Sequence, residues 1–125
     1  MAVEIERIHE RIGEAEIMAI ARAFYARVAA DPVLRPMYPG DDLSGAEQRL
    51  AAFLIYRLGG PRGYLEQRGH PRLGMRHAPF PIDEEARDRW LACMAAALDE
   101  RRLPDDVDLA LRRFFAGLAE FLRNR

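Results

Sequence analysis

The sequence predicts an all-α protein. Four segments repeat apolar residues with the 3.6-residue period of a helix, and no segment alternates apolar and polar residues with the β-branched content of a strand. Half of the 125 residues are apolar, which is enough for one core without disulfides. We therefore expect a single helical domain over residues 1–125.

A short amphipathic piece from Ile5 to Ile12 opens the chain, and a long helix follows it. The apolar stripe of this helix runs from Ile17 to Val28. It ends before Asp31-Pro32, because proline disfavours helical continuation through the residue that precedes it. His9 falls on the polar side of the opening piece, and we expect no role for it.

The second long helix carries an apolar stripe from Ala46 to Leu58. Ser44 and Glu47 match a capping box, in which a serine at the N-cap and a glutamate three residues later satisfy each other's backbone amides. The helix is predicted to end at Gly59-Gly60-Pro61, where glycine closes the last turn and proline prevents its continuation.

Two further helices complete the expected set. One carries its stripe from Trp90 to Leu98 and has Asp83 as its predicted N-cap. The other begins near Pro104 and carries its stripe from Val107 to Leu122.

The stretch from Gly59 to Pro81 interrupts this regularity. It holds four of the eight prolines and five of the nine glycines, between two strongly periodic helices. Long irregular stretches inside compact domains are usually functional or disordered. This one keeps apolar side chains to pack, so we expect an ordered segment that forms the wall of a ligand cavity.

Two histidines lie in this stretch, His70 directly before Pro71 and His77 two residues before Pro79. Histidine is the commonest neutral nitrogen ligand of metals. The apolar neighbours favour one axial haem ligand over a closed zinc site, which would need two more ligands at credible spacing. An ordinary histidine in a turn fits the residues as well. We interpret His70 as a residue that packs the loop.

Charge and composition exclude several classes of protein. The net charge is −1, and all 19 fixed cations are arginines, which a GC-rich genome explains. A nucleic-acid surface needs a basic face, which this balance does not supply. Cys93 has no partner for a disulfide, no apolar run is long enough to cross a bilayer, and the acidic N-terminus does not resemble a signal peptide. We expect a cytoplasmic protein that binds neither membrane nor nucleic acid.

Several short motifs, taken in order, resemble the group II truncated haemoglobins from about Ile12 to Asn124. They are Phe24-Tyr25, Asp31-Pro32-Val33-Leu34-Arg35, Tyr38-Pro39, Gly59-Gly60-Pro61, Gly69-His70-Pro71-Arg72-Leu73, Arg76-His77-Ala78-Pro79-Phe80 and Arg87-Asp88-Arg89-Trp90-Leu91. The resemblance implies a truncated globin-like two-over-two helical sandwich that encloses haem b. The family usually has a glycine pair before its first long helix, where this chain has Gly13-Glu14.

The resemblance also implies roles for individual residues. His77 would be the proximal iron ligand, and Tyr25, Tyr38 and Trp90 would form a polar distal cluster. Ala46 stands where ordinary globins carry a distal histidine, and Leu50 follows one turn later. The apolar stripes alone would place Tyr25 and Trp90 simply in the core.

Matching positions give the expected surroundings of the haem. Arg49, Tyr64 and Arg76 would hold the propionates, because a guanidinium suits a carboxylate bidentately. The residues expected to line the cavity are Phe24, Phe53, Leu54, Leu73, Met75, Phe80 and Met94.

The expected function is the binding of dioxygen and other diatomic ligands such as carbon monoxide and nitric oxide. The alternative is a redox enzyme that performs nitric oxide dioxygenation or peroxide reduction. The chain has no flavin or nicotinamide motif, so this chemistry would need a separate reductase. A third class is a haem-free helical scaffold. Both a monomer and a homodimer are compatible with the sequence.

Overall fold

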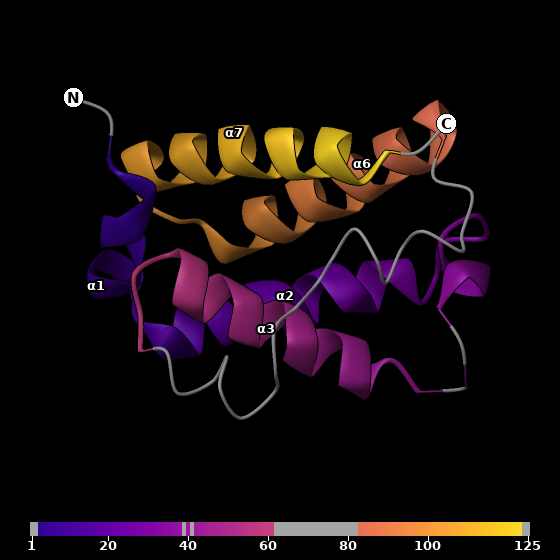
Figure 1. Cartoon of the computed structure of the whole chain (residues 1–125), viewed down its shortest axis with the longest axis horizontal. Coiled ribbons are helices and arrows are strands. Elements are labelled where there is room, and N and C mark those ends of the chain that lie inside the picture. The colour runs from indigo at the N-terminus through magenta and orange to yellow at the C-terminus, as the bar shows by residue number, and fades with distance from the viewer. Residues whose placement is uncertain (1–2, 39, 41, 62–82, 124–125) are drawn as a thin grey trace.

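The computed structural model describes residues 3–38, 40, 42–61 and 83–123. In these ranges the regular elements are five α-helices and two short 3₁₀ turns, with no strand (Figure 1). The elements are η1 (Ile5–Arg7), α1 (Ile8–Ile12), α2 (Glu14–Val28), η2 (Arg35–Met37), α3 (Ser44–Arg57), α6 (Glu84–Arg101) and α7 (Asp105–Leu122).

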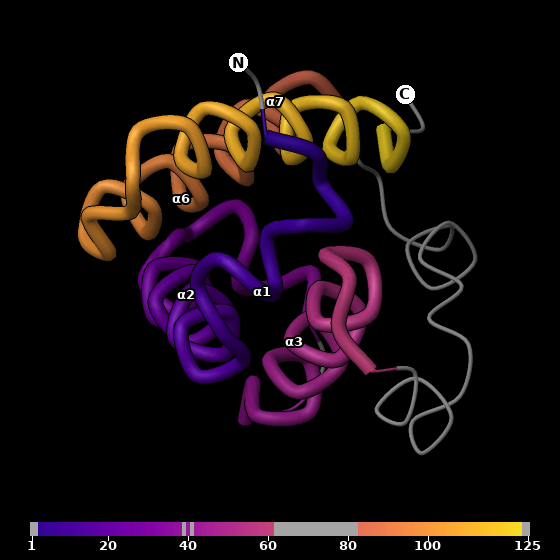
Figure 2. Tube along the Cα trace, turned by 90° about the vertical axis from the view of Figure 1, so that its left-hand side faces the viewer, coloured from indigo at the N-terminus to yellow at the C-terminus, as the bar shows by residue number. Residues whose placement is uncertain are grey.

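The long helices form two layers of two. Figures 1 and 2 show α6 and α7 side by side on one side of the molecule, with α2 and α3 on the other. Helix α2 packs against both α3 and α6, so it joins the layers. The expected all-α, two-over-two arrangement is confirmed.

Helix α2 forms because its apolar residues return to one face with each turn. Ile17, Ile20, Phe24 and Val28 have at most 1% of their surface exposed. Past the end of the helix, the carboxylate of Asp31 accepts hydrogen bonds from the backbone amides of Val33 and Leu34, both at 2.9 Å. The predicted end before Asp31-Pro32 is therefore confirmed.

The predicted capping box at the start of α3 is wrong. Ser44 is already the first helical residue, and the N-cap is Leu43, which makes no side-chain capping bond. Asp42 takes over the polar role: its carboxylate accepts from the Ser44 amide at 2.8 Å and from the Ser44 hydroxyl at 2.8 Å. A carboxylate two residues earlier is a stronger acceptor than a serine hydroxyl, so Ser44 donates to it.

The opening piece packs against the end of α3, as Gly59 and Gly60 permit. Gly59 has φ +101°, and a Cβ there would lie 1.8 Å from the Glu6 carbonyl oxygen. A Cβ at Gly60 would lie 2.6 Å from Cδ2 of His9. Only glycine allows both the left-handed backbone and this approach.

His9, which the sequence places on the polar side of the opening piece, is half-buried in the structure. Its backbone amide donates to the Leu58 carbonyl at 2.8 Å, which draws the ring against Gly60. Nε2 is buried, and within the described residues it has no hydrogen-bond partner. The contact of the backbone with α3 decides the position of this ring, which helical periodicity cannot foresee.

The first bend of the chain depends on one glycine. Gly13 separates α1 from α2 with φ +86°. The family usually has two glycines at this corner. The second of these positions is Glu14 here, which is the first residue of α2. One left-handed glycine is thus sufficient for this corner.

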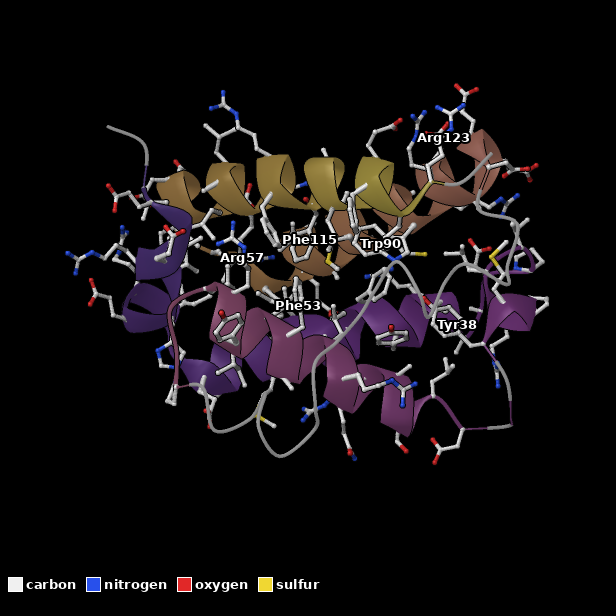
Figure 3. All side chains as sticks on the ribbon, in the orientation of Figure 1. Tyr38, Phe53, Arg57, Trp90, Phe115 and Arg123 are labelled. Carbon is white, nitrogen blue, oxygen red and sulfur yellow. The ribbon has the colours of Figure 1, made fainter. Side chains whose placement is uncertain are left out.

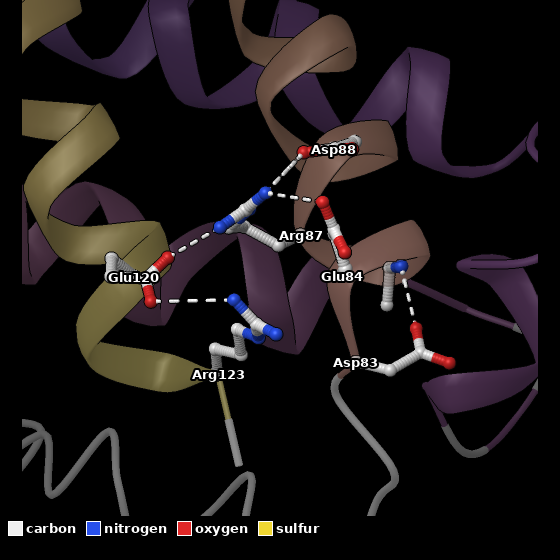
Figure 4. A network of polar contacts seen from close by, with 7 residues as sticks. Asp83, Glu84, Arg87, Asp88, Glu120 and Arg123 are labelled. Atoms are coloured by element: carbon white, nitrogen blue, oxygen red, sulfur yellow. Dashed lines mark hydrogen bonds and ion pairs between the residues drawn. The ribbon is translucent and has the colours of Figure 1, made fainter. Parts of the chain in front are cut away.

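Helix α6 begins as predicted. The carboxylate of Asp83 accepts from the Ala86 amide at 2.9 Å and caps the helix. Arg87, one turn further on, joins α6 to the end of α7 through Glu120 at 2.6 Å, and it also pairs with Asp88 and Glu84 (Figure 4).

Among the described residues, no helix combines the length and apolarity that a membrane span requires.

Candidate functional site

Three aromatic residues with polar groups come together from separate elements. Tyr25 lies near the end of α2, Tyr38 follows η2, and Trp90 lies in α6. Tyr25 is 8% exposed, and the other two are half-buried against the core. Tyr38 and Trp90 both lie in the half of the molecule away from α1 (Figure 3).

The two tyrosine contacts are arranged edge to face, and Phe24 meets Trp90 at a tilt of 58°. The Tyr25 and Tyr38 centroids are 5.5 Å apart with an interplanar angle of 89°. Phe24 links this pair to Trp90, with centroids 4.9 Å from Tyr25 and 5.0 Å from Trp90. Such contacts fix ring orientation because the positive edge of one ring meets the negative face of another.

Burial sets the ionisation of the two phenols. It raises the pKa of Tyr25 well above its ordinary value, and the nearby Tyr38 raises it further. Burial also raises the pKa of Tyr38, against hydrogen bonding from Tyr25 and Trp90, which favours the phenolate. Both hydroxyls therefore stay protonated at neutral pH and act as hydrogen-bond donors.

Arg35 fixes the backbone that carries Tyr38. Its guanidinium donates to the carbonyl of Tyr38 at 2.9 Å and to that of Gly40 at 2.7 Å. The sequence gives no sign of this role, because an arginine in a turn has no pattern that reveals a carbonyl partner. The position of Tyr38 is therefore held by a charge-assisted contact outside any helix.

The apolar residues expected near the site are divided between core and edge. Leu50, Leu54 and Met94 are buried, the last two with at most 1% exposed. Phe53 and Ala46, on the same helix as Leu50, are only half-buried. Helix α3 thus contributes buried leucines and a partly open face beside them.

Arg49 is exposed on α3, and its guanidinium approaches Gly45, where a Cβ would lie 3.2 Å from Nη1. Within the described part of the chain it forms no ion pair with a carboxylate, whereas Arg11 and Arg57 form one each and Arg87 forms three.

The remaining predicted site residues lie outside the described ranges. They are Tyr64, Leu73, Met75, Arg76, His77 and Phe80, and His70, expected to pack the loop, also lies there. In the described ranges, no group of three or more histidine, cysteine, aspartate or glutamate residues could hold a metal ion.

Two residues near the cluster were recognised from the sequence only as core. Phe115 of α7 packs against Trp90 with centroids 5.9 Å apart. Cys93, one turn after Trp90, is buried as expected, and burial raises the pKa of its thiol. Their apolar stripes predicted burial but could not identify the ring or helix that each contacts.

Comparisons with known proteins agree on one family. The family model for bacterial-like globins matches residues 7–124. The chain is 41% identical over 112 residues to Group 2 truncated haemoglobin YjbI of Bacillus subtilis (strain 168), covering 90% of this chain and 81% of that protein.

Solved structures give the same result. A thermostable haemoglobin from the actinobacterium Thermobifida fusca superposes with a TM-score of 0.86 at 51% identity, covering 90% of this chain and 92% of that one. A truncated oxygen-avid haemoglobin from Bacillus subtilis superposes with a TM-score of 0.85 at 39% identity, covering 93% and 98%.

Proposed function

The chain belongs to the group II truncated haemoglobins, within the bacterial-like globin family, and from this membership we propose that it binds haem b through His77 and holds dioxygen beside Tyr25, Tyr38 and Trp90. Family membership itself implies a haem iron cofactor and the binding of a ligand there. When bound, haem supplies an iron that takes a diatomic ligand and exchanges electrons.

The described residues fit such a group. Leu54 and Met94 are apolar, as residues around a porphyrin face are, and both belong to the buried core. Arg49 offers a cation for a propionate. Tyr64 and Arg76, the other residues proposed for the propionates, lie outside the described ranges. Phe53 and Ala46 give the partly open face of α3 further contact area.

The polar cluster supports the preference for dioxygen. A diatomic ligand that gains partial negative charge is stabilised by hydrogen-bond donors in a site of low polarity. The protonated phenols of Tyr25 and Tyr38 and the indole of Trp90 are donors of this kind. This cluster is the observation that carries the proposal, and the oxygen-avid relative agrees with it.

Nitric oxide dioxygenation is the second candidate function. Peroxide reduction requires a base to take a proton from the peroxide, and phenols with raised pKa values offer hydrogens instead. Dioxygenation has no such need: nitric oxide, dioxygen and one electron give nitrate. The electron would come from a separate reductase, and turnover to nitrate when a reductase is supplied tests this candidate.

Absorption spectra of the purified protein test the primary function. The ferric, dithionite-reduced and carbon monoxide-treated forms are compared with those of a His77→Gly variant. We expect a Soret band that shifts with carbon monoxide in the wild type. In the variant we expect it only when imidazole is added, because free imidazole replaces the missing ligand.

The matched control is His70→Gly, which removes the other histidine of the same segment. It is expected to keep the band and its shift without imidazole. A wild type that shows no Soret band after haemin is supplied would contradict the proposal. Loss of the band in His70→Gly but not in His77→Gly would identify His70 as the iron ligand.

A further inference from the structure

The opening piece is fastened to α3 and α7, two helices that lie far from it in the sequence. The His9 amide donates to the Leu58 carbonyl at the end of α3. Arg11 makes two hydrogen bonds to Asp106 in the first turn of α7, at 2.8 and 3.0 Å. Figure 1 shows the piece at this end of the molecule. These contacts join it to surfaces that any other copy of the chain also carries.

A single residue, Gly13, separates the opening piece from α2. Its amide donates to the His9 carbonyl at 2.8 Å, and its carbonyl accepts from the Ile17 amide at 3.2 Å. Both bonds have the four-residue spacing of an α-helix. The break comes from its dihedral angles, φ +86° and ψ 162°, which residues with a side chain avoid. The joint between α1 and α2 is therefore one residue long.

A continuous helix through Gly13 is the alternative conformation of this joint. Gly13 has no side chain to cap α2, and a continuous helix gives the amides of the first turn the carbonyls of α1 as acceptors. Glu14, at the second position of the glycine pair usual in the family, favours a helix. Straightening therefore adds backbone hydrogen bonds, at the cost of one glycine inside a helix.

The direction of the apolar side chains decides where a straightened piece can pack. At about 100° per residue, Ile8 lies about 180° around a continuous helix from Ile17, and Ile12 lies about 140° from it. Ile17 is fully buried in the core of its own chain, as Ile8 is in the bent form. In the straightened form Ile8 points away from that core, so only another molecule can bury it.

We propose that the opening piece exchanges between two copies of this chain, so that each copy packs residues 5–12 on the α3 and α7 of the other. Exchange of an identical element is a low-cost route to a dimer, because each contact of the monomer is made again between the copies. Ile8 regains a buried site, and Arg11 meets the Asp106 of the second copy. The exchange uses none of the residues proposed to hold haem, so it does not depend on the proposed function.

Gly13→Ala tests the hinge in the purified full-length chain. Alanine is strained in the bent form by the positive φ, whereas it favours the straight helix. We expect the association constant of the dimer to rise about tenfold for each of its two hinges, roughly a hundredfold in all. Size-exclusion chromatography with light scattering, over a range of protein concentrations, measures this constant.

Gly40→Ala is the matched control. Gly40 also has a positive φ, +85°, and nothing lies within 4 Å of the position that its Cβ would take, which is true of Gly13 as well. It is remote from the hinge, so the variant is expected to associate as the wild type does. A Gly13→Ala variant that associates no more strongly than Gly40→Ala overturns the proposal.

A second test leaves Gly13 in place and uses the contact between Arg11 and Asp106. Arg11→Glu and Asp106→Arg each bring like charges together there, whether the piece packs on its own chain or on another. A dimer with one copy of each variant restores opposite charges at both contacts. After equilibration, the mixture is expected to hold about fivefold more dimer than either variant alone, because both pairs are exposed. Salt at about 1 M should remove this gain by screening.

Mixing also distinguishes exchange from other modes of pairing. A dimer that is equally abundant in the mixture and in the separate variants joins through another surface, and this result overturns the proposal. A chain that stays monomeric at every concentration, as wild type and as Gly13→Ala, also overturns it, because the opening piece then remains on its own chain.

Discussion

At the scale of residues, two glycines of this chain differ in whether another residue could replace them. Gly59 sits with φ +101° against the Glu6 carbonyl, where a side chain has neither an allowed backbone nor space. Gly117 lies in α7 with nothing within 4 Å of the position that a Cβ would take. The first is needed for the contact between the opening piece and α3, while the second only weakens its helix.

Substituting these two glycines should therefore change stability in opposite directions. Gly59→Ala is expected to lower the free energy of unfolding by roughly 2 kcal/mol, through left-handed strain and the contact with Glu6. Gly117→Ala should raise it by about 0.5–1 kcal/mol, because alanine favours a helix interior. Urea unfolding measures both, and equal effects would refute the close approach at Gly59.

At the scale of elements, the sequence predicts helices better than helix ends. The 3.6-residue period locates the four long helices because each buries one face. Caps depend on competition between neighbours. Asp83 caps α6 as predicted, but near α3 the carboxylate of Asp42 engages Ser44 and displaces the expected capping box.

This difference at the two helix starts can be measured. Asp83→Ala is expected to lower the free energy of unfolding by about 1 kcal/mol, since it removes the acceptor for the Ala86 amide. Ser44→Ala should cost only a few tenths, because Ser44 caps nothing. Thermal unfolding of the two variants compares them. A larger loss of stability in Ser44→Ala would mean that Ser44 does cap α3.

Contacts between elements are also beyond what the pattern predicts. An apolar stripe indicates which face of a helix is buried, but not the partner that buries it. The pairing of Trp90 with Phe115 and of Arg87 with Glu120, 33 residues away, depends on the final packing of α6 on α7. For the same reason the stripes placed Tyr25 and Trp90 in the core, and only the family resemblance indicated that they meet a ligand.

At the scale of the whole molecule, aromatic rings join the two layers. Phe24 of α2 contacts Trp90 of α6, and Trp90 contacts Phe115 of α7 at 5.9 Å. Phe115 is 1% exposed, and its ring also contacts that of Phe114. The Phe114 ring in turn lies 5.5 Å from the Arg57 guanidinium of α3. The polar cluster is thus supported by the same rings that hold the layers together.

Truncating one of these rings should affect the molecule as a whole. Phe115→Ala is expected to lower the free energy of unfolding by about 3–5 kcal/mol, the usual loss for a buried phenylalanine. Phe121→Ala is the control on the same helix; its ring is 70% exposed, so the change should stay within about 0.5 kcal/mol. Chemical denaturation measures both, and a small loss at Phe115 would show that the layers pack without it.

The attachment of the opening piece sets an order of events during synthesis. Glu6 pairs with Arg57 across 51 positions, and Arg11 pairs with Asp106 across 95. At roughly 5–20 residues per second, the first of these partners follows after about 3–10 seconds and the second after about 5–20 seconds. The opening piece is therefore synthesised seconds before either partner, and both of its ion pairs form only after those partners have followed.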